Sequence, residues 1–173
     1  MDAFLHSVQV WLRGTQLSYI MNNVQWAWRT SESIHFIGLS LLMGTVGLFD
    51  LRMIGLVKRV PVAALHRLIP FGILGYAMNV MTGITFLAGA PDQYIYNPAF
   101  QMKMLFMGTA GLNVAVFYLT IYRRVAATGP GDEAPFPARI AGGVSLICWV
   151  GVIFCGRFLT FYRPPAWHWC PWC

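Results

Sequence analysis

The chain has 173 residues, of which 57% are hydrophobic and only 10% are charged, and its formal net charge is +6. Soluble domains carry charge on about a quarter of their residues, so this composition and a mean hydropathy of +0.58 exclude an ordinary water-soluble fold. The basic excess does not indicate a nucleic-acid partner, because the cations cluster in loops between apolar segments, as membrane topology requires.

The first 29 residues mix apolar and polar side chains. Apolar residues recur at helical spacing at Phe4, Leu5, Val8, Trp11 and Leu12. This pattern is typical of an amphipathic helix that lies in the membrane interface; an unstructured, aromatic-rich leader is the alternative.

Four long segments contain no Asp, Glu, Lys or Arg: 33–49, 68–91, 104–122 and 140–156. Crossing a hydrocarbon layer of about 30 Å takes roughly 20 mainly apolar residues, and each segment reaches that length with its flanks. The sequence therefore predicts an all-α fold, a four-helix transmembrane bundle with an N-terminal amphipathic interfacial helix. The expected units are the interfacial helix at 1–29, the transmembrane domain at 30–163 and an outer-face tail rich in aromatic and cysteine residues at 164–173.

Local signals place the ends of the four helices. Thr30 is the predicted N-cap of the first helix, and Pro91 follows the end of the second. Asn97-Pro98 predicts the start of the third helix, and a Gly/Pro-rich loop over 127–137 separates it from the fourth. Small residues such as Gly38 recur along the helices and predict close packing inside the bundle, with a dimer face as the alternative.

Positive charge lies in the first and third connections between the predicted helices. These cations are Arg52, Lys58, Arg59, Arg67, Arg123, Arg124 and Arg139, whereas the second connection carries only Asp92. Positive loops stay on the cytoplasmic side. We therefore expect a multi-pass protein of a bacterial inner membrane with both termini on the periplasmic side.

Four ionisable residues lie near the predicted outer ends of the spans: Glu32, His35, Lys103 and Arg157. An ionisable group inside a span costs at least ~2.5 kcal/mol on insertion scales, so these residues indicate function. The helical rise places His35, Lys103 and Arg157 at similar depth, and Glu32 shares a helix face with His35. We expect this layer to hold haem b or a quinone. Alternatively, the two cations extend to lipid phosphates and Glu32 caps its helix.

His66 is predicted at the cytoplasmic start of the second helix, too far from His35 to share a haem with it. A haem on His35 would take a second axial ligand from His6, His168 or another protomer, or would keep an open position. Asp50, with other polar residues near His66, is expected to serve packing and interface anchoring rather than a site.

The C-terminal tail contains His168, Cys170 and Cys173 in an H-x-C-x₂-C pattern. These three ligands suit Zn²⁺ or copper. A disulfide, unreactive thiols and thiol–disulfide exchange are the alternatives that the same spacing leaves open.

Several stretches together resemble a family of uncharacterised bacterial four-helix integral membrane proteins. They are ESIH at Glu32–His35, DLRMIGL at Asp50–Leu56, NPAFQMK at Asn97–Lys103 and GRFLTFY at Gly156–Tyr162. The resemblance implies the four-helix membrane fold and no established activity.

From these observations we expect a membrane redox subunit that binds haem b or a quinone near the outer face and relays electrons to a partner. The alternative is a non-catalytic accessory or assembly subunit of a larger membrane complex. A small transporter is less favoured, because no span is visibly broken around a midplane site. The expected partners are the lipid bilayer and either other membrane subunits or further copies of this chain.

Overall fold

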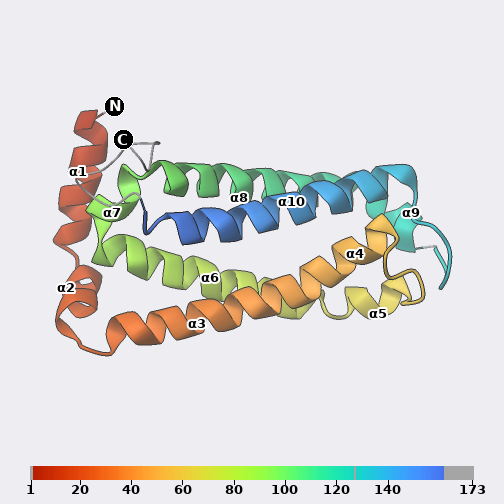
Figure 1. Cartoon of the computed structure of the whole chain (residues 1–173), viewed down its shortest axis with the longest axis horizontal. Helices are drawn as coiled ribbons and strands as arrows, with labels where there is room; N and C mark the ends of the chain where they lie inside the picture. The colour runs from red at the N-terminus through yellow and green to blue at the C-terminus, as the bar shows by residue number, and fades with distance from the viewer. Residues whose placement is uncertain (1, 127, 162–173) are drawn as a thin grey trace.

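The computed structural model describes residues 2–126 and 128–161, and within these ranges it is α-helical without strands. Four helical segments are long and apolar enough to cross a membrane: Ala27–Ile54, Val62–Gly89, Pro98–Ala126 and Phe136–Phe158. They run lengthwise beside one another (Figure 1). The predicted all-α class and the four membrane-compatible helices are confirmed.

The first three spans are divided into several elements. The first contains α3 (Ala27–Leu42), the π-helical turn η1 (Met43–Gly47) and α4 (Leu48–Ile54), and the second contains α5 (Val62–His66) and α6 (Ile69–Gly89). After the short α7 (Pro91–Ile95), the third contains α8 (Pro98–Val116), the π-helical turn η2 (Phe117–Ile121) and α9 (Tyr122–Ala126). The fourth is the unbroken α10 (Phe136–Phe158).

Two predicted helix starts have different outcomes. The Asn97 side chain caps α8 by accepting a hydrogen bond from the Ala99 backbone N–H at 2.9 Å, as predicted. The predicted cap at Thr30 is wrong, because α3 already begins at Ala27 and Trp26 occupies the N-cap without a side-chain bond. His35 is therefore eight residues into α3, at about 12 Å of helical rise.

Glycines on facing helices let α3 and α6 approach closely. A Cβ added to Gly75 of α6 would lie 2.5 Å from the Gly38 carbonyl oxygen of α3. On the other side, α10 packs on α4 at Gly142, where an added Cβ would lie 2.8 Å from the Met53 side chain. Gly108 on α8, in contrast, faces open space. Gly38, Gly75 and Gly142 thus lie at helix–helix contacts inside the bundle, whereas Gly108 does not.

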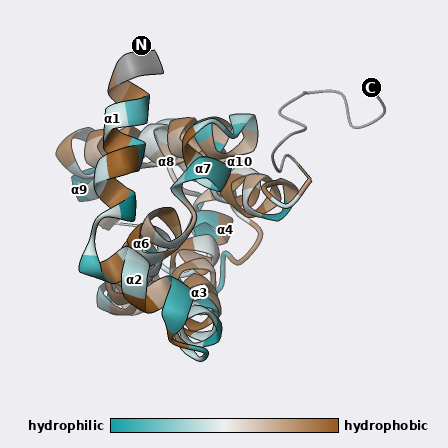
Figure 2. Cartoon of the chain, turned by 90° about the vertical axis from the view of Figure 1, so that its left-hand side faces the viewer, coloured by the Kyte–Doolittle hydropathy of each residue, from teal (hydrophilic) through white to brown (hydrophobic). Residues whose placement is uncertain are grey.

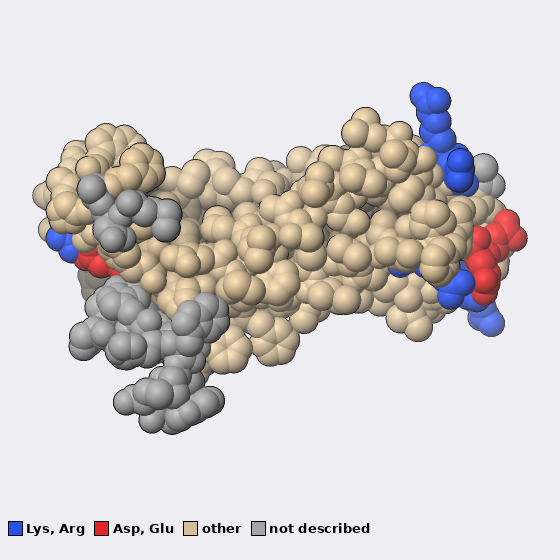
Figure 3. Space-filling view, turned by 90° about the horizontal axis from the view of Figure 1, so that it is seen from above, with Lys and Arg blue, Asp and Glu red and all other residues tan. Residues whose placement is uncertain are grey.

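The loop end of the bundle is held by a fully buried arginine. Arg52 donates from Nε to the Val60 carbonyl at 2.8 Å and from Nη2 to the Gly129 carbonyl at 3.2 Å, and so ties the first and third connections together. Charged side chains gather near the two ends on the face seen in Figure 3. Lys58 hydrogen-bonds to Glu133 and, together with the charge of Arg139, holds the pKa of that exposed carboxyl below its usual range.

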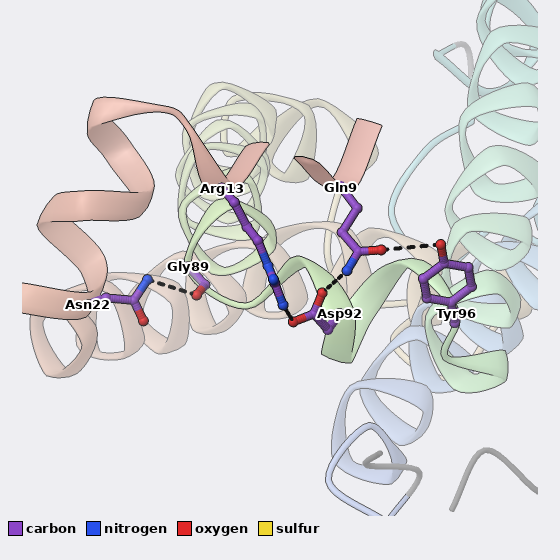
Figure 4. Close-up of polar contacts among 6 residues, drawn as sticks. All are labelled: Gln9, Arg13, Asn22, Gly89, Asp92 and Tyr96. Atoms are coloured by element: carbon purple, nitrogen blue, oxygen red, sulfur yellow. Dashed lines mark hydrogen bonds and ion pairs between the residues drawn. The ribbon is translucent and has the colours of Figure 1, made fainter. Parts of the chain in front are cut away.

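The N-terminal helices α1 (Asp2–Arg13) and α2 (Gln16–Asn23) cover the opposite end. Figures 1 and 2 show α1 lying crosswise to the long helices, whose surfaces are largely hydrophobic. Gln9 and Arg13 of α1 both bind the Asp92 carboxylate of α7, and Tyr96 donates to Gln9 at 3.2 Å (Figure 4). Asn22 of α2 donates to the Gly89 carbonyl at 3.0 Å. These contacts fix α1 and α2 across this end of the bundle.

Gly75→Ala should destabilise the fold by about 1–3 kcal/mol, because the new methyl group would meet the α3 backbone. Gly83→Ala on the same helix is the matched control, since its Cβ would face open space and alanine favours the helix. Thermal unfolding of the purified protein in detergent measures both. Equal midpoints for the two variants would contradict the close α3–α6 contact.

Candidate functional site

The imidazole of His35 is held by the neighbouring helix. Its Nδ1 lies 2.7 Å from the Thr82 hydroxyl of α6, and its ring packs edge-on against Phe86 at 5.5 Å between centroids. Thr82 is buried, and His35 is half-buried between α3 and α6. The close approach of these two helices at their glycines brings the pair together.

The hydrogen bonds of Thr82 indicate which His35 nitrogen carries the proton. The hydroxyl has one proton, and it donates that proton to the Met78 carbonyl at 2.6 Å. With its proton on a backbone carbonyl, the hydroxyl can only accept from His35 Nδ1–H, and we infer the tautomer in which Nε2 keeps its lone pair. Nε2 has no hydrogen-bond partner within the described ranges. A metal-binding histidine is oriented in this way, with its other nitrogen donating to a neighbour.

The other predicted layer residues differ in their surroundings. Lys103 of α8 is half-buried and close enough to His35 and to Cys155 of α10 to interact with both electrostatically. No carboxylate pairs with Lys103 in the part of the chain that the structure describes. Glu32 and Arg157 are exposed, and neither forms an ion pair there. The structure thus brings Lys103 toward His35 and leaves the other two at the surface.

The remaining predicted ligands do not add to this layer. His66 lies in α5 at the opposite end of the second span, where it stacks on Tyr122 at 4.9 Å between ring centroids. His6 lies in α1. His168, Cys170 and Cys173 lie outside the described residues. Among the described residues, no group of three or more His, Cys, Asp or Glu side chains could hold a metal ion.

The structure also contains a cavity that sequence reasoning missed. It has a volume of about 740 Å³ and is lined by residues of all four spans. Most of the lining is apolar, but polar residues of all four spans also line it: Asp50, His66, Arg67, Tyr76, Asn113, Tyr118, Ser145 and Trp149. From the sequence, Asp50 was expected to serve packing or anchoring. Its position on the cavity also allows a role in binding a ligand.

Three polar atoms at this cavity lack hydrogen bonds. The Ser145 hydroxyl lies toward the Asp50 carboxyl. Nevertheless Asp50 Oδ2, Ser145 Oγ and Trp149 Nε1 are buried and have no partner of normal hydrogen-bond geometry in the described structure. Such atoms are costly inside a membrane, because no lipid group compensates them. In the sequence, Asp50 stands directly after the charge-free segment 33–49 and two residues before Arg52, which makes it look like a residue of the span end.

The fold and these buried polar groups define a polytopic α-helical membrane protein with polar side chains between its spans. The chain belongs to a family of unknown function, DUF6644, whose family model matches residues 9–162. This match confirms the resemblance found in the sequence. No curated protein and no solved structure gave a significant match.

Thr82→Val should allow His35 to populate both neutral tautomers. Valine keeps the shape of threonine but offers no hydroxyl to accept a hydrogen bond from Nδ1–H. Thr85→Val is the matched control, since the Thr85 hydroxyl donates to the Thr82 carbonyl and does not contact His35. Nitrogen-15 NMR of labelled histidine should show one neutral tautomer, with Nδ1 protonated, in the wild type and in Thr85→Val. A mixture is expected in Thr82→Val. The same spectrum for all three proteins would contradict the tautomer assignment.

Proposed function

We propose that this protein is a membrane redox subunit that binds haem b through His35 and relays electrons to a partner. One observation carries the proposal: Thr82 orients the imidazole so that its Nε2 lone pair is left for a ligand. Haem b supplies one-electron chemistry when bound. His35 would hold the iron through Nε2, and Thr82 would fix the imidazole ring and raise its basicity.

The charges around His35 suit the carboxylates of a haem. Lys103 brings a cation without a carboxylate partner into its neighbourhood, and the exposed Arg157 adds a second cation near this end of α10. These side chains would neutralise the two propionates. Glu32, one turn before His35 on α3, would face the outer edge of the site.

A quinone at His35 fits less well than a haem. The carbonyl oxygens of an oxidised quinone accept hydrogen bonds, but the imidazole proton is already donated to Thr82. A neutral His35 therefore offers a lone pair rather than a donor. This distinction favours an electrophilic centre such as haem iron over a carbonyl.

His35→Ala should abolish haem binding, because it removes the axial nitrogen. The purified wild type should show a Soret band and, in the reduced-minus-oxidised spectrum, an α-band. His66→Ala is the matched control and should keep both, since His66 lies at the other end of the second span. Thr82→Val should weaken haem binding by about 10–100-fold through loss of the orienting bond.

A colourless wild-type preparation, or a His35→Ala variant with the wild-type spectrum, would overturn this proposal. A colourless protein that copurifies stoichiometrically with a larger membrane enzyme would instead support the accessory role.

Metal analysis with and without residues 166–173 tests the separate expectation of zinc or copper at His168, Cys170 and Cys173.

We further propose that the protein lies in a bacterial inner membrane with α1 on the periplasmic side. The support is the set of cations in the first and third connections. In a chain whose own cysteines are replaced by serine, Val10→Cys should react with a membrane-impermeant maleimide in intact spheroplasts. Arg59→Cys should react only after permeabilisation. The opposite pattern would place His35 near the cytoplasmic face.

A further inference from the structure

We propose that the cavity between the four spans binds the ring of a lipid-soluble quinone. This site is separate from the haem site proposed at His35, which does not line the cavity. The inference depends on three features of the described structure: an opening toward lipid, a largely apolar lining and buried polar atoms without partners.

The opening follows from how the helices pack. The structure packs α3 against α6, α8 against α10 and α10 against α4, so these three contacts close most of the perimeter. Helices α6 and α8 are consecutive long helices joined through α7, but they make little direct contact with each other. The cavity is partly open and is lined by residues of both helices, so we infer that a molecule dissolved in the bilayer enters between them.

The π-helical turns contribute to the same region. Val46 of η1 and Phe117 and Tyr118 of η2 all line the cavity. Such turns change which face of a helix the following residues occupy, and they occur frequently at functional sites. Here they border one space from two different spans.

The unpartnered polar atoms exclude a simple lipid chain as the occupant. Asp50, Ser145 and Trp149 are each more than nine-tenths buried, with exposed fractions of 6%, 3% and 7%. The Ser145 hydroxyl and the Asp50 carboxyl can partly compensate each other, but an acyl chain would leave the Trp149 Nε1–H without an acceptor. A strongly polar solute would face a mainly apolar wall, so the occupant must combine an apolar body with a few hydrogen-bonding atoms.

A quinone ring matches the chemistry and the spacing of these groups. Trp149 is a donor only, whereas the Asp50 carboxylate accepts and Ser145 can do either. The quinone form accepts at two oxygens and the quinol form also donates, so both kinds of protein group find a partner. Trp149 lies one helical turn, about 6 Å, from Ser145, which is comparable with the distance between opposite oxygens of a six-membered ring.

The aromatic and aliphatic lining provides the rest of the contact. Phe49 and Phe117 pack edge to face at 5.7 Å between centroids, and both line the cavity. Tyr76 packs on Trp149 at the other end of the space, at 6.1 Å. The ring would lie among these side chains, with its isoprenoid tail leaving between α6 and α8.

Two glycines of α8 provide a matched test. Gly111 lines the cavity and a Cβ added there meets nothing within 4 Å, so Gly111→Leu is expected to reduce the space without disturbing the backbone. Gly108 lies one turn earlier, also faces open space and does not line the cavity, so Gly108→Leu is the control. The probe is decylubiquinone, titrated into protein in phosphatidylcholine nanodiscs that contain no quinone. Empty nanodiscs provide the background.

Wild type and Gly108→Leu should bind one decylubiquinone saturably, and Gly111→Leu should lose at least tenfold in affinity. Trp149→Phe, which keeps an aromatic ring but removes the donor, should lose about tenfold. Its control is Trp26→Phe, because Trp26 is exposed and outside the cavity. Circular dichroism of each variant checks folding.

Absence of saturable binding to the wild type would overturn the proposal, as would equal affinity of Gly111→Leu and Gly108→Leu. Unchanged affinity of Trp149→Phe for decylubiquinone would contradict the placement of a quinone oxygen beside Trp149 Nε1. Haem absorbance measured on the same samples reports on His35 alone, so failure of either site is distinguishable from failure of the other.

Discussion

A polar group inside a membrane must be compensated by the protein or by a ligand, because lipid offers it no hydrogen bond. This constraint separates the buried polar residues of the chain into two kinds. Asn97 and Thr82 have protein partners, and even the fully buried Arg52 binds two loop carbonyls. Trp149 Nε1 and Asp50 Oδ2 have none in the described structure. The first kind holds the helices and loops in place, and the second indicates where a ligand would be stabilising.

Glycine contacts determine where the bundle closes and where it stays open. The Gly38–Gly75 contact allows α3 and α6 to meet at backbone distance, and Gly142 allows α10 to reach α4. No comparable contact draws α6 and α8 together, so the cavity lies on that side. The close α3–α6 approach also brings Thr82 to His35. The same packing thus orients the imidazole near one end of the spans and leaves space nearer the other.

Charge-free runs and local capping chemistry sufficed to predict the four helices, because span length and the Asn97-Pro98 start are properties of short segments. The start at Ala27 was missed because the chain before Thr30 continues the helix without a polar cap at Trp26. The cavity was missed for a different reason. Asp50 and Trp149 are 99 residues apart, and only the packing of α10 on α4 brings them to one space. Periodicity along one helix contains no information about which other helix it contacts. For the same reason, the prediction placed Lys103 at the level of His35 from its depth along the helix alone.

The two proposed sites differ in the chemistry that their protein groups can perform. His35 offers a fixed lone pair beside a cation without a carboxylate partner in the described structure, which suits an electrophilic centre bearing carboxylates. The cavity offers a donor and an acceptor in an apolar space open to lipid, which suits an uncharged ring that enters from the bilayer. At His35 a quinone carbonyl would meet an imidazole whose proton is already shared with Thr82. Hydrogen-bond polarity is therefore the reason for proposing haem at His35 and a quinone in the cavity.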